Sequence, residues 1–261
     1  MSREAVRLEE VPGIGTSEAG RLAPEIYAGF VSFLASLDAD DWLAPTVCVG
    51  WTVKDISAHL LGWAEAIVSP RELLAQLRKT RARAQEFGNS VDAQNQVQVD
   101  DRKDLSTDEL LTRMQTTLPR AALVRKRLAR GLHYLPAYSA FLGGRSNAGY
   151  LLNVIFLRDA LVHRVDIAEA TGRSADLSEA ESRLFHDMLH DWARRARADV
   201  VLELAGAGGG RFVAREGRSG SIAGRVTDLV KLFSGRAGVD EMVLDGERET
   251  LARYLAQPCP V

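Results

Sequence analysis

The stretch RDALVHRVDIA, residues 158–168, carries three titratable side chains within a helical run that is otherwise apolar. At about 100° per residue, His163 lies about 40° from Asp159, and Asp166 lies about 20° away on the other side. Apolar residues share this sector: Leu152, Ile155, Phe156 and Val162. The polar group therefore points into the predicted interior, where an unpaired carboxylate is costly. The segment predicts either a buried ion pair, formed by Asp159 with His163 or with an arginine, or a metal site.

A second inward histidine favours the metal site. On the helix expected over residues 52–68, His59 is in phase with apolar side chains, namely Ile56, Trp63 and Ile67. Helical bundles build metal sites from facing helices, so His59, Asp159 and His163 are predicted to form one ligand set. Three N/O ligands that leave a position open fit catalytic zinc. Non-haem iron or nickel is an alternative for two histidines and a carboxylate.

The remaining histidines carry weaker signals. His186 and His190 are spaced i, i+4 in HDMLH, but the apolar face of their predicted helix is formed by other residues, namely Leu184, Phe185, Met188, Leu189, Trp192 and Ala196. Helical phase therefore predicts that both are solvated surface side chains. His133 lies in a predicted loop and has no partner signal. Only His59 and His163 are predicted to be functional.

The bulk composition excludes several classes of protein. The chain has 261 residues and a net charge of −2, which gives no reason to expect binding to nucleic acid or to an anionic membrane. The N-terminal residues lack the apolar segment of a secretory signal, and no apolar run is long enough to cross a bilayer. The two cysteines, Cys48 and Cys259, suit a reducing compartment. A cytoplasmic protein is expected, with Cys48 as a small buried apolar residue rather than a nucleophile.

The chain divides into two predicted parts. Residues 1–196 read as a mainly helical region built on a four-helix bundle, with helices expected over 17–37, 52–68, 71–87, 106–130, 148–170 and 178–198. A polar stretch (88–105) and a loop (132–147) separate some of them. Residues 197–261 read as a small α/β domain: DVVLELAG and RFVAREG form a hairpin, followed by a helix, a short strand at 241–246 and a last helix.

Two signatures resemble a known family. Residues 42–60, WLAPTVCVGWTVKDISAHL, resemble the N-terminal signature of mycothiol-dependent maleylpyruvate isomerase-like proteins, which belong to the DinB-like metal-binding four-helix-bundle superfamily. Residues 158–173, RDALVHRVDIAEATGR, resemble the second signature of that family. The tail, VTDLVKLFSGR followed by VLDGERETLARYL, is similar to its small C-terminal domain, which resembles sterol carrier protein folds.

The resemblance implies a ligand set and a thiol cofactor. By position, the metal ligands of the family fall on His59, Asp159 and His163, although the family usually has glutamate where this chain has Asp159. The implied groups are a divalent metal, with Zn²⁺ expected, and mycothiol as the thiol co-substrate. Arg236, in the sequence SGR, matches a C-terminal-domain motif and is implied to help bind the thiol.

The implied chemistry is attack of the metal-bound mycothiol thiolate on a small electrophilic substrate, giving isomerisation or S-transfer. Asp55 and Asp166, each one turn from a ligand, are candidates to orient the ligands. Tyr134, Tyr138 and Arg145, in the loop 132–147 that also holds His133 and Phe141, are candidate substrate-pocket residues. A hydrolase that activates water at the metal and a non-catalytic ligand-binding protein remain alternatives. Either a monomer or a homodimer is expected.

Overall fold

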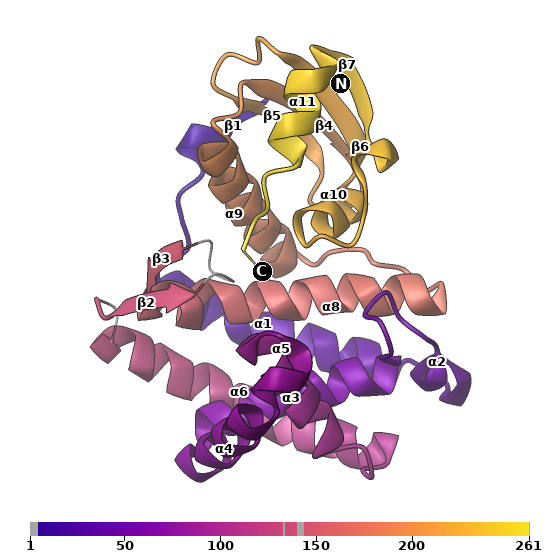
Figure 1. Ribbon diagram of the computed structural model, residues 1–261. Coiled ribbons are helices and arrows are strands. Elements are labelled where there is room, and N and C mark those ends of the chain that lie inside the picture. Colours follow the sequence, from indigo (N-terminus) through magenta and orange to yellow (C-terminus); the bar gives the residue numbers. More distant parts are fainter. Residues whose placement is uncertain (1–4, 133, 140–143, 261) are drawn as a thin grey trace.

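The structure is a computed structural model that describes residues 5–132, 134–139 and 144–260, and its N-terminal part is the expected helical bundle. Four long helices surround one apolar core: α1 (Thr16–Ala35), α3 (Val53–Val68), α6 (Thr107–Leu132) and α8 (Phe156–Thr171). Figure 1 shows α8 between the other bundle helices on one side and the sheet on the other. Because of this position, α8 presents one face to each half of the molecule.

Local sequence signals set the start of α3 and the end of α8, the two helices that carry the predicted ligands. α3 begins at the predicted capping box, in which the Thr52 side chain accepts from the backbone of Asp55 and the Asp55 carboxylate accepts from the backbone of Thr52. α8 ends at Gly172, whose φ of 67° is readily adopted only by glycine. A short helix, α7 (Ala148–Tyr150), and a π-helical turn (Leu151–Ile155) lead directly into α8.

Several elements of the first part differ from the sequence expectation. The polar stretch 88–105 contains a helix, α5 (Ser90–Asp100), which follows α4 (Pro70–Phe87) and buries Ala93, Val97 and Val99. Its apolar side chains do not follow a clean helical stripe, so periodicity does not reveal it. A short helix, α2 (Ala39–Leu43), lies in a predicted loop. The loop expected at 132–147 includes a two-stranded antiparallel hairpin of β2 (Pro136–Ser139) and β3 (Gly144–Asn147).

The C-terminal part is the expected small α/β domain, built on a five-stranded sheet in the order β1-β5-β4-β6-β7. The predicted hairpin is present as antiparallel β4 (Val200–Ala205) and β5 (Gly210–Ala214). Two strands were not anticipated: β6 (Gly220–Arg225), which pairs parallel to β4, and β1 (Val6–Arg7), which pairs parallel to β5. The other elements are α10 (Val226–Phe233), β7 (Val243–Gly246) and α11 (Arg248–Leu255).

Helix α9 (Glu179–Ala196) joins the two halves. Trp192 is fully buried, its ring lies 5.3 Å from that of Phe233 on α10, and its indole N–H donates to the carbonyl of Tyr254 at 2.9 Å. β1 comes from the other end of the chain yet completes the edge of the same sheet (Figure 1). Segments from both termini and from α9 therefore cover the sheet that sits above α8.

The interpretation of His186 and His190 as solvated side chains is wrong. His186 Nε2 lies 2.8 Å from the carbonyl oxygen of Gly208, and His190 Nδ1 lies 2.8 Å from that of Leu8. Both rings are half-buried, because the C-terminal sheet and the N-terminal segment pack on the face of α9 that the bundle leaves uncovered. The helical wheel identified the main apolar face of α9 correctly, since its six residues pack in or against the core, but it could not show this second packing surface. Neither histidine approaches a metal-ligating cluster among the described residues.

Among the described residues, no helix has both the length and the apolar character that a bilayer-spanning segment needs.

Candidate metal centre

Three side chains from two facing helices converge at one point. His59 comes from α3, and Asp159 and His163 come from successive turns of α8. His59 Nε2 lies 3.5 Å from one carboxylate oxygen of Asp159, and His163 Nε2 lies 3.4 Å from the other. One ligand atom from each residue lies within 4.8 Å of the other two. The ligand set predicted from helical phase is therefore brought together in the fold.

These distances fit a bound cation. Zinc–nitrogen and zinc–oxygen bonds of about 2.0–2.2 Å in a tetrahedral site separate neighbouring ligand atoms by roughly 3.3–3.6 Å. The two distances measured from Asp159 lie in that range. The aspartate at this position, one methylene shorter than glutamate, therefore still reaches both imidazoles. The group is a candidate metal-binding triad of two histidines and one carboxylate.

Of the three side chains in the triad, only that of Asp159 is partly exposed. His59 and His163 are 2% and 5% exposed, whereas the Asp159 side chain is 23% exposed. The two imidazoles are thus shielded by the bundle, and access is by way of the carboxylate. Three protein ligands with one accessible side are typical of catalytic zinc sites, while structural sites are closed by four protein ligands.

Each imidazole is oriented by a hydrogen bond at its other nitrogen. His163 Nδ1 lies 2.9 Å from Asp166 Oδ2, and His59 Nδ1 lies 2.9 Å from Gln98 Oε1. An acceptor at Nδ1 fixes the proton there and leaves the Nε2 lone pair free for a metal. Asp166 therefore lies where it can orient His163, and Gln98 lies where it can orient His59.

Gln98 was missed because it lies on α5, the helix that periodicity did not predict. It is fully buried, and its amide N–H donates to Gln76 Oε1 at 3.0 Å. Gln76 in turn donates to the carbonyl oxygen of Gly62 on α3. This chain of amides anchors the His59 contact to the backbone of the helix that carries His59.

Electrostatics of the group also favour a cation. Burial alone would lower the pKa of His163, but the charge of Asp159 and the hydrogen bond to Asp166 raise it to about 10. Burial would raise the pKa of Asp159, but the neighbouring charge of His163 and the hydrogen bond with His59 hold it below its ordinary value. In the absence of a metal, a proton on His163 supplies the positive charge. The buried ion pair that the sequence left open is thus the metal-free form of the same group.

The C-terminal domain reaches this site through Arg236. Its Nε lies 2.9 Å from Asp166 Oδ2 and 2.8 Å from Oδ1, so a guanidinium holds the carboxylate that orients His163. Arg236 follows α10, which packs against α8 (Figure 1). The bundle and the small domain therefore both contribute to the centre.

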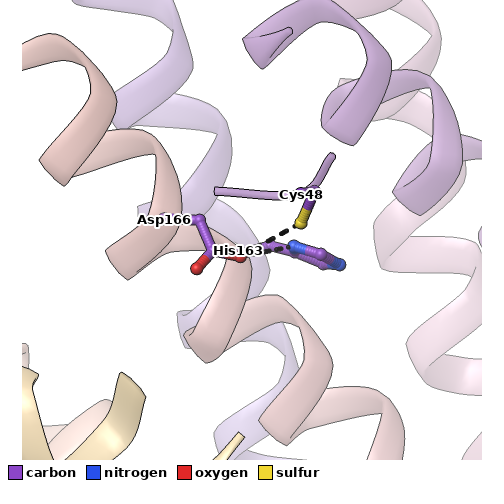
Figure 2. A group of neighbouring side chains, drawn as sticks. All are labelled: Cys48, His163 and Asp166. Carbon is purple, nitrogen blue, oxygen red and sulfur yellow. Dashed lines mark hydrogen bonds and ion pairs between the residues drawn. The ribbon is translucent and has the colours of Figure 1, made fainter. Parts of the chain in front are cut away.

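The interpretation of Cys48 as a buried apolar residue is wrong. Its half-buried thiol lies 3.7 Å from Asp166 Oδ2 and 3.7 Å from Arg236 Nη2. Figure 2 shows the Cys48 thiol and the His163 ring both directed at the Asp166 carboxylate. Cys48 with His163 and Asp166 forms a second cluster of possible metal donors. Asp166 is already held by Arg236, however, and His163 Nδ1 is engaged by Asp166, so the triad with Asp159 is the better cation site.

A pocket of about 410 Å³ opens onto the triad. Asp159, His163, Arg236 and Cys48 line its inner end. Its other walls come from the loop before α3 and from the α4–α5 region: Val49, Trp51, Phe87, Asp92, Asn95 and Gln96. Sequence reasoning missed Asp92, Asn95 and Gln96 because they come from the stretch 88–105, which was read as a polar connection.

Other predicted site residues lie elsewhere. Asp55 does not contact a ligand: its carboxylate accepts from the backbone N–H of Thr52 at 2.8 Å, so helix capping accounts for it. Tyr134 is 92% exposed and is not among the pocket residues. Tyr138 and Arg145 pair with each other across the β2–β3 hairpin, and their side chains lie outside what the structure describes. His133 and Phe141 lie outside the described residues.

Comparison with known proteins identifies the family. The model of the mycothiol maleylpyruvate isomerase N-terminal domain matches residues 24–168, more than half of the chain, and the chain belongs to this family. The matched segment contains His59, Asp159 and His163, whereas Arg236 lies beyond it. No curated protein matches the sequence.

Two solved structures share the fold along most of the chain. They are crystal structures of the mycothiol-dependent maleylpyruvate isomerase and of a histidine-to-alanine mutant of that enzyme, at 18% and 17% sequence identity. Each has a TM-score of 0.55, and each match covers 92% of this chain and 95% of the other. The likeness extends through the C-terminal domain and supports the two-part architecture. At this identity it establishes the fold alone.

Proposed function

We propose that the protein is a metal-dependent enzyme that uses mycothiol to transform a small electrophilic substrate, by isomerisation or by S-transfer. The observation that carries this proposal is the accessible His59–Asp159–His163 triad at the inner end of a 410 Å³ pocket. The family match supports mycothiol as the thiol of this proposal, because mycothiol is named in the description of the family and of both similar structures. Zinc is the metal expected for this donor set.

A divalent cation held by these three ligands would keep a coordinating thiol in its thiolate form near neutral pH. The protein's own residues prepare the site for that anion. Asp166 and Gln98 hold the two imidazoles with Nε2 directed at Asp159. Arg236, with its side chain 19% exposed at the pocket wall, places a permanent positive charge beside the centre. That charge favours an anionic ligand over a neutral one.

The pocket walls suit a small substrate with both apolar and polar parts. Trp51 and Phe87 supply aromatic surface, and Asn95 and Gln96 supply amide groups. The Trp51 indole donates to Gln96 Oε1 at 3.1 Å, and its ring lies 5.3 Å from that of His59, so the ring is held in the pocket wall beside a candidate ligand. A rigid wall of this kind positions a substrate against the reacting thiol and contributes through orientation.

The proposal is tested by metal analysis and by calorimetric titration with mycothiol. We expect about one metal ion per chain, and mycothiol binding that is lost on chelation and restored by Zn²⁺. His59→Ala should lose both the metal and mycothiol binding, whereas His190→Ala, which removes a histidine outside the site, should retain both.

Absence of stoichiometric metal from wild-type protein supplied with zinc would refute the proposal. If the protein binds metal but does not bind mycothiol in a chelator-sensitive way, the metal site stands and the role of mycothiol is refuted. An assay with simple ester and amide substrates would then test metal-activated water as the nucleophile.

A further inference from the structure

A series of buried side-chain amides runs from His59 away from the metal centre. His59 Nδ1 lies 2.9 Å from Gln98 Oε1, and Gln98 Nε2 donates to Gln76 Oε1 at 3.0 Å. Gln76 Nε2 donates in turn to Glu72 Oε1 at 2.9 Å and to the carbonyl oxygen of Gly62 at 3.0 Å. Both glutamines are fully buried. The contacts from His59 through Gln98 and Gln76 to Glu72 are referred to below as the amide relay.

The far end of the amide relay fixes its direction. The carbonyl oxygen and the ionised carboxylate at this end only accept hydrogen bonds, so the Gln76 atom that faces them has to be the amide nitrogen. Glu72 stays ionised: burial would raise its pKa, but the hydrogen bonds from Gln76 and Arg102 hold it below its ordinary value. Gln76 Oε1 therefore faces Gln98, which presents its N–H, and Gln98 Oε1 is left to face His59.

This direction decides which nitrogen of His59 can bind a metal. Because Nδ1 faces an acceptor, it carries a hydrogen, and the lone pair of the neutral ring is on Nε2, the atom 3.5 Å from Asp159. In the opposite arrangement, Gln98 would donate to Nδ1, and Nε2 would donate to Asp159 and be blocked for a metal. That arrangement would also turn Gln98 Oε1 toward Gln76 Oε1, and two buried acceptors that face each other are costly.

The backbone of α3 leaves room for the amide relay at a glycine. Gly62 lies inside the helix, one turn after His59, where glycine costs about 1 kcal/mol relative to alanine. A Cβ at this position would lie 2.6 Å from Gln98 Cβ and 2.7 Å from its Cγ, closer than side chains tolerate. On α5, the carbonyl oxygen of Gln98 accepts from Arg102 Nη1 at 3.0 Å. The glycine and the arginine therefore keep Gln98 within reach of His59.

We propose that Gln76 and Gly62 are positioning residues of the metal centre, which act through Gln98 to keep the hydrogen of His59 on Nδ1 and leave Nε2 free for the metal. The proposal rests on the metal site of the function proposed above and does not depend on mycothiol. The amide relay suppresses the metal-blocking tautomer before a metal binds. His163 needs no such relay, because both carboxylate oxygens of Asp166 accept hydrogen bonds.

Zinc affinity of the full chain, measured by competition with a chelator, tests the acceptor at position 76. Gln76→Leu removes that acceptor and lets Gln98 turn over, so zinc affinity should fall about tenfold, at the low end for residues that orient ligands. Gln76→Glu keeps an oxygen opposite Gln98 and should bind zinc more tightly than Gln76→Leu, although a carboxyl group beside Glu72 makes it less stable. Gln85→Leu changes an exposed glutamine of the same helix and should bind zinc as wild type does.

Two further variants show whether the effect passes through Gln98. Gly62→Ala should lower zinc affinity although alanine favours the helix, because its Cβ displaces Gln98. In a Gln98→Leu background, Gln76→Leu should cause no further loss of zinc affinity, since the two residues act as a series. The proposal is wrong if Gln76→Leu lowers zinc affinity by the same factor in both backgrounds, or if it binds zinc as tightly as wild type.

NMR of the metal-free protein, with signals that correlate ring protons with ring nitrogens, reports the tautomer directly. His59→Ala assigns the signals. Wild-type His59 should keep a hydrogen on Nδ1 from about pH 6 to about pH 9, whereas Gln76→Leu should show Nδ1 without a hydrogen at the upper end of this range. A loss of general packing would not move the hydrogen between the two nitrogens. Wild-type His59 without a hydrogen on Nδ1 would overturn the proposal.

The two readouts keep this proposal distinguishable from the proposed function. If wild type binds zinc while Gln76→Leu changes neither zinc affinity nor the tautomer of His59, only the amide relay fails. If wild type binds no zinc but the tautomer changes in Gln76→Leu, the proposed function fails and the control of His59 by Gln76 stands.

Discussion

Arg158 and Asp159 are neighbours on α8, yet they belong to two buried polar clusters with opposite properties. Arg158 is completely buried, and its guanidinium donates to Asp187 Oδ2 at 2.8 Å, to the hydroxyl of Tyr150 at 3.0 Å and to the carbonyl oxygen of Pro260 at 2.8 Å. Its charge is matched by carboxylates of α9. Asp159 faces two imidazoles at 3.4 and 3.5 Å, distances longer than a good hydrogen bond.

The Arg158 cluster stabilises the fold, whereas the Asp159 cluster forms the candidate metal site. The Arg158 cluster is held by permanent charges and joins α8, α9 and the C-terminal tail, so it fixes the face of α8 that the sheet covers. The Asp159 cluster depends on a proton that His163 can release, and it opens into a pocket. One helix therefore carries a rigid clamp on one face and an exchangeable cation site on the other.

The largest expected effect is the loss of stability on removing Arg158 from its buried cluster. Arg158→Ala leaves Asp187 and Asp191 buried without their main cation, and removal of one partner from a buried pair costs about 3–5 kcal/mol. We expect the free energy of unfolding, measured by urea denaturation of metal-free protein, to fall by that amount. Below the unfolding transition, metal affinity should change little, because Arg158 does not contact the triad.

The matched control uses another arginine that contacts Asp191. Arg194 lies 3.0 Å from the same carboxylate, but its side chain is 66% exposed, and exposed ion pairs contribute about 0–1 kcal/mol. Arg194→Ala should therefore be close to neutral. Equal losses from the two variants would contradict the distinction between a buried clamp and a surface contact.

The sequence predicts the ligands because they lie on regular helices. Helical phase places His59, Asp159 and His163 inside the bundle, and the structure brings them together. The capping box at Thr52 sets where α3 begins and hence the phase of His59. Local rules are sufficient where a side chain's direction depends only on its own helix.

The remainder of the site depends on contacts that no local pattern encodes. Gln98 reaches His59 from α5, a helix with little amphipathic pattern, and Cys48 reaches Asp166 from an irregular loop. The same reason explains β1, a two-residue strand whose partner, β5, lies some 200 residues away along the chain. Such long-range pairings are fixed by tertiary packing, which overrides local propensity.

A smaller effect is expected from the residues that orient the ligands. Gln98→Leu removes the acceptor at His59 Nδ1, and loss of such a contact typically lowers metal affinity by about 10–100-fold. Competition with a chelator of known affinity measures the change. Gln96→Leu is the control, because Gln96 is on the same helix but bonds to Trp51 and Asp100. If both variants bind zinc as tightly as wild type, Gln98 has no orienting role.

The smallest effect is a difference in pH dependence that arises from His163. In metal-free protein its pKa is raised from 6.5 to about 10. A raised folded-state pKa contributes stability that is fully present below the unfolded value and is lost as the pH rises through the folded value. The metal-bound form has the opposite dependence, because binding requires the neutral ring and releases its proton.

Thermal unfolding of the zinc-loaded and metal-free forms, recorded from pH 6 to about pH 9, should therefore give a Tm difference that widens as the pH rises. Taking the difference within one protein cancels titrations that the two forms share. Asp166→Asn should reduce this widening, because it removes the carboxylate that accepts from His163 Nδ1. A Tm difference that narrows with rising pH would mean that the proton on His163 and the metal do not compete for the same site.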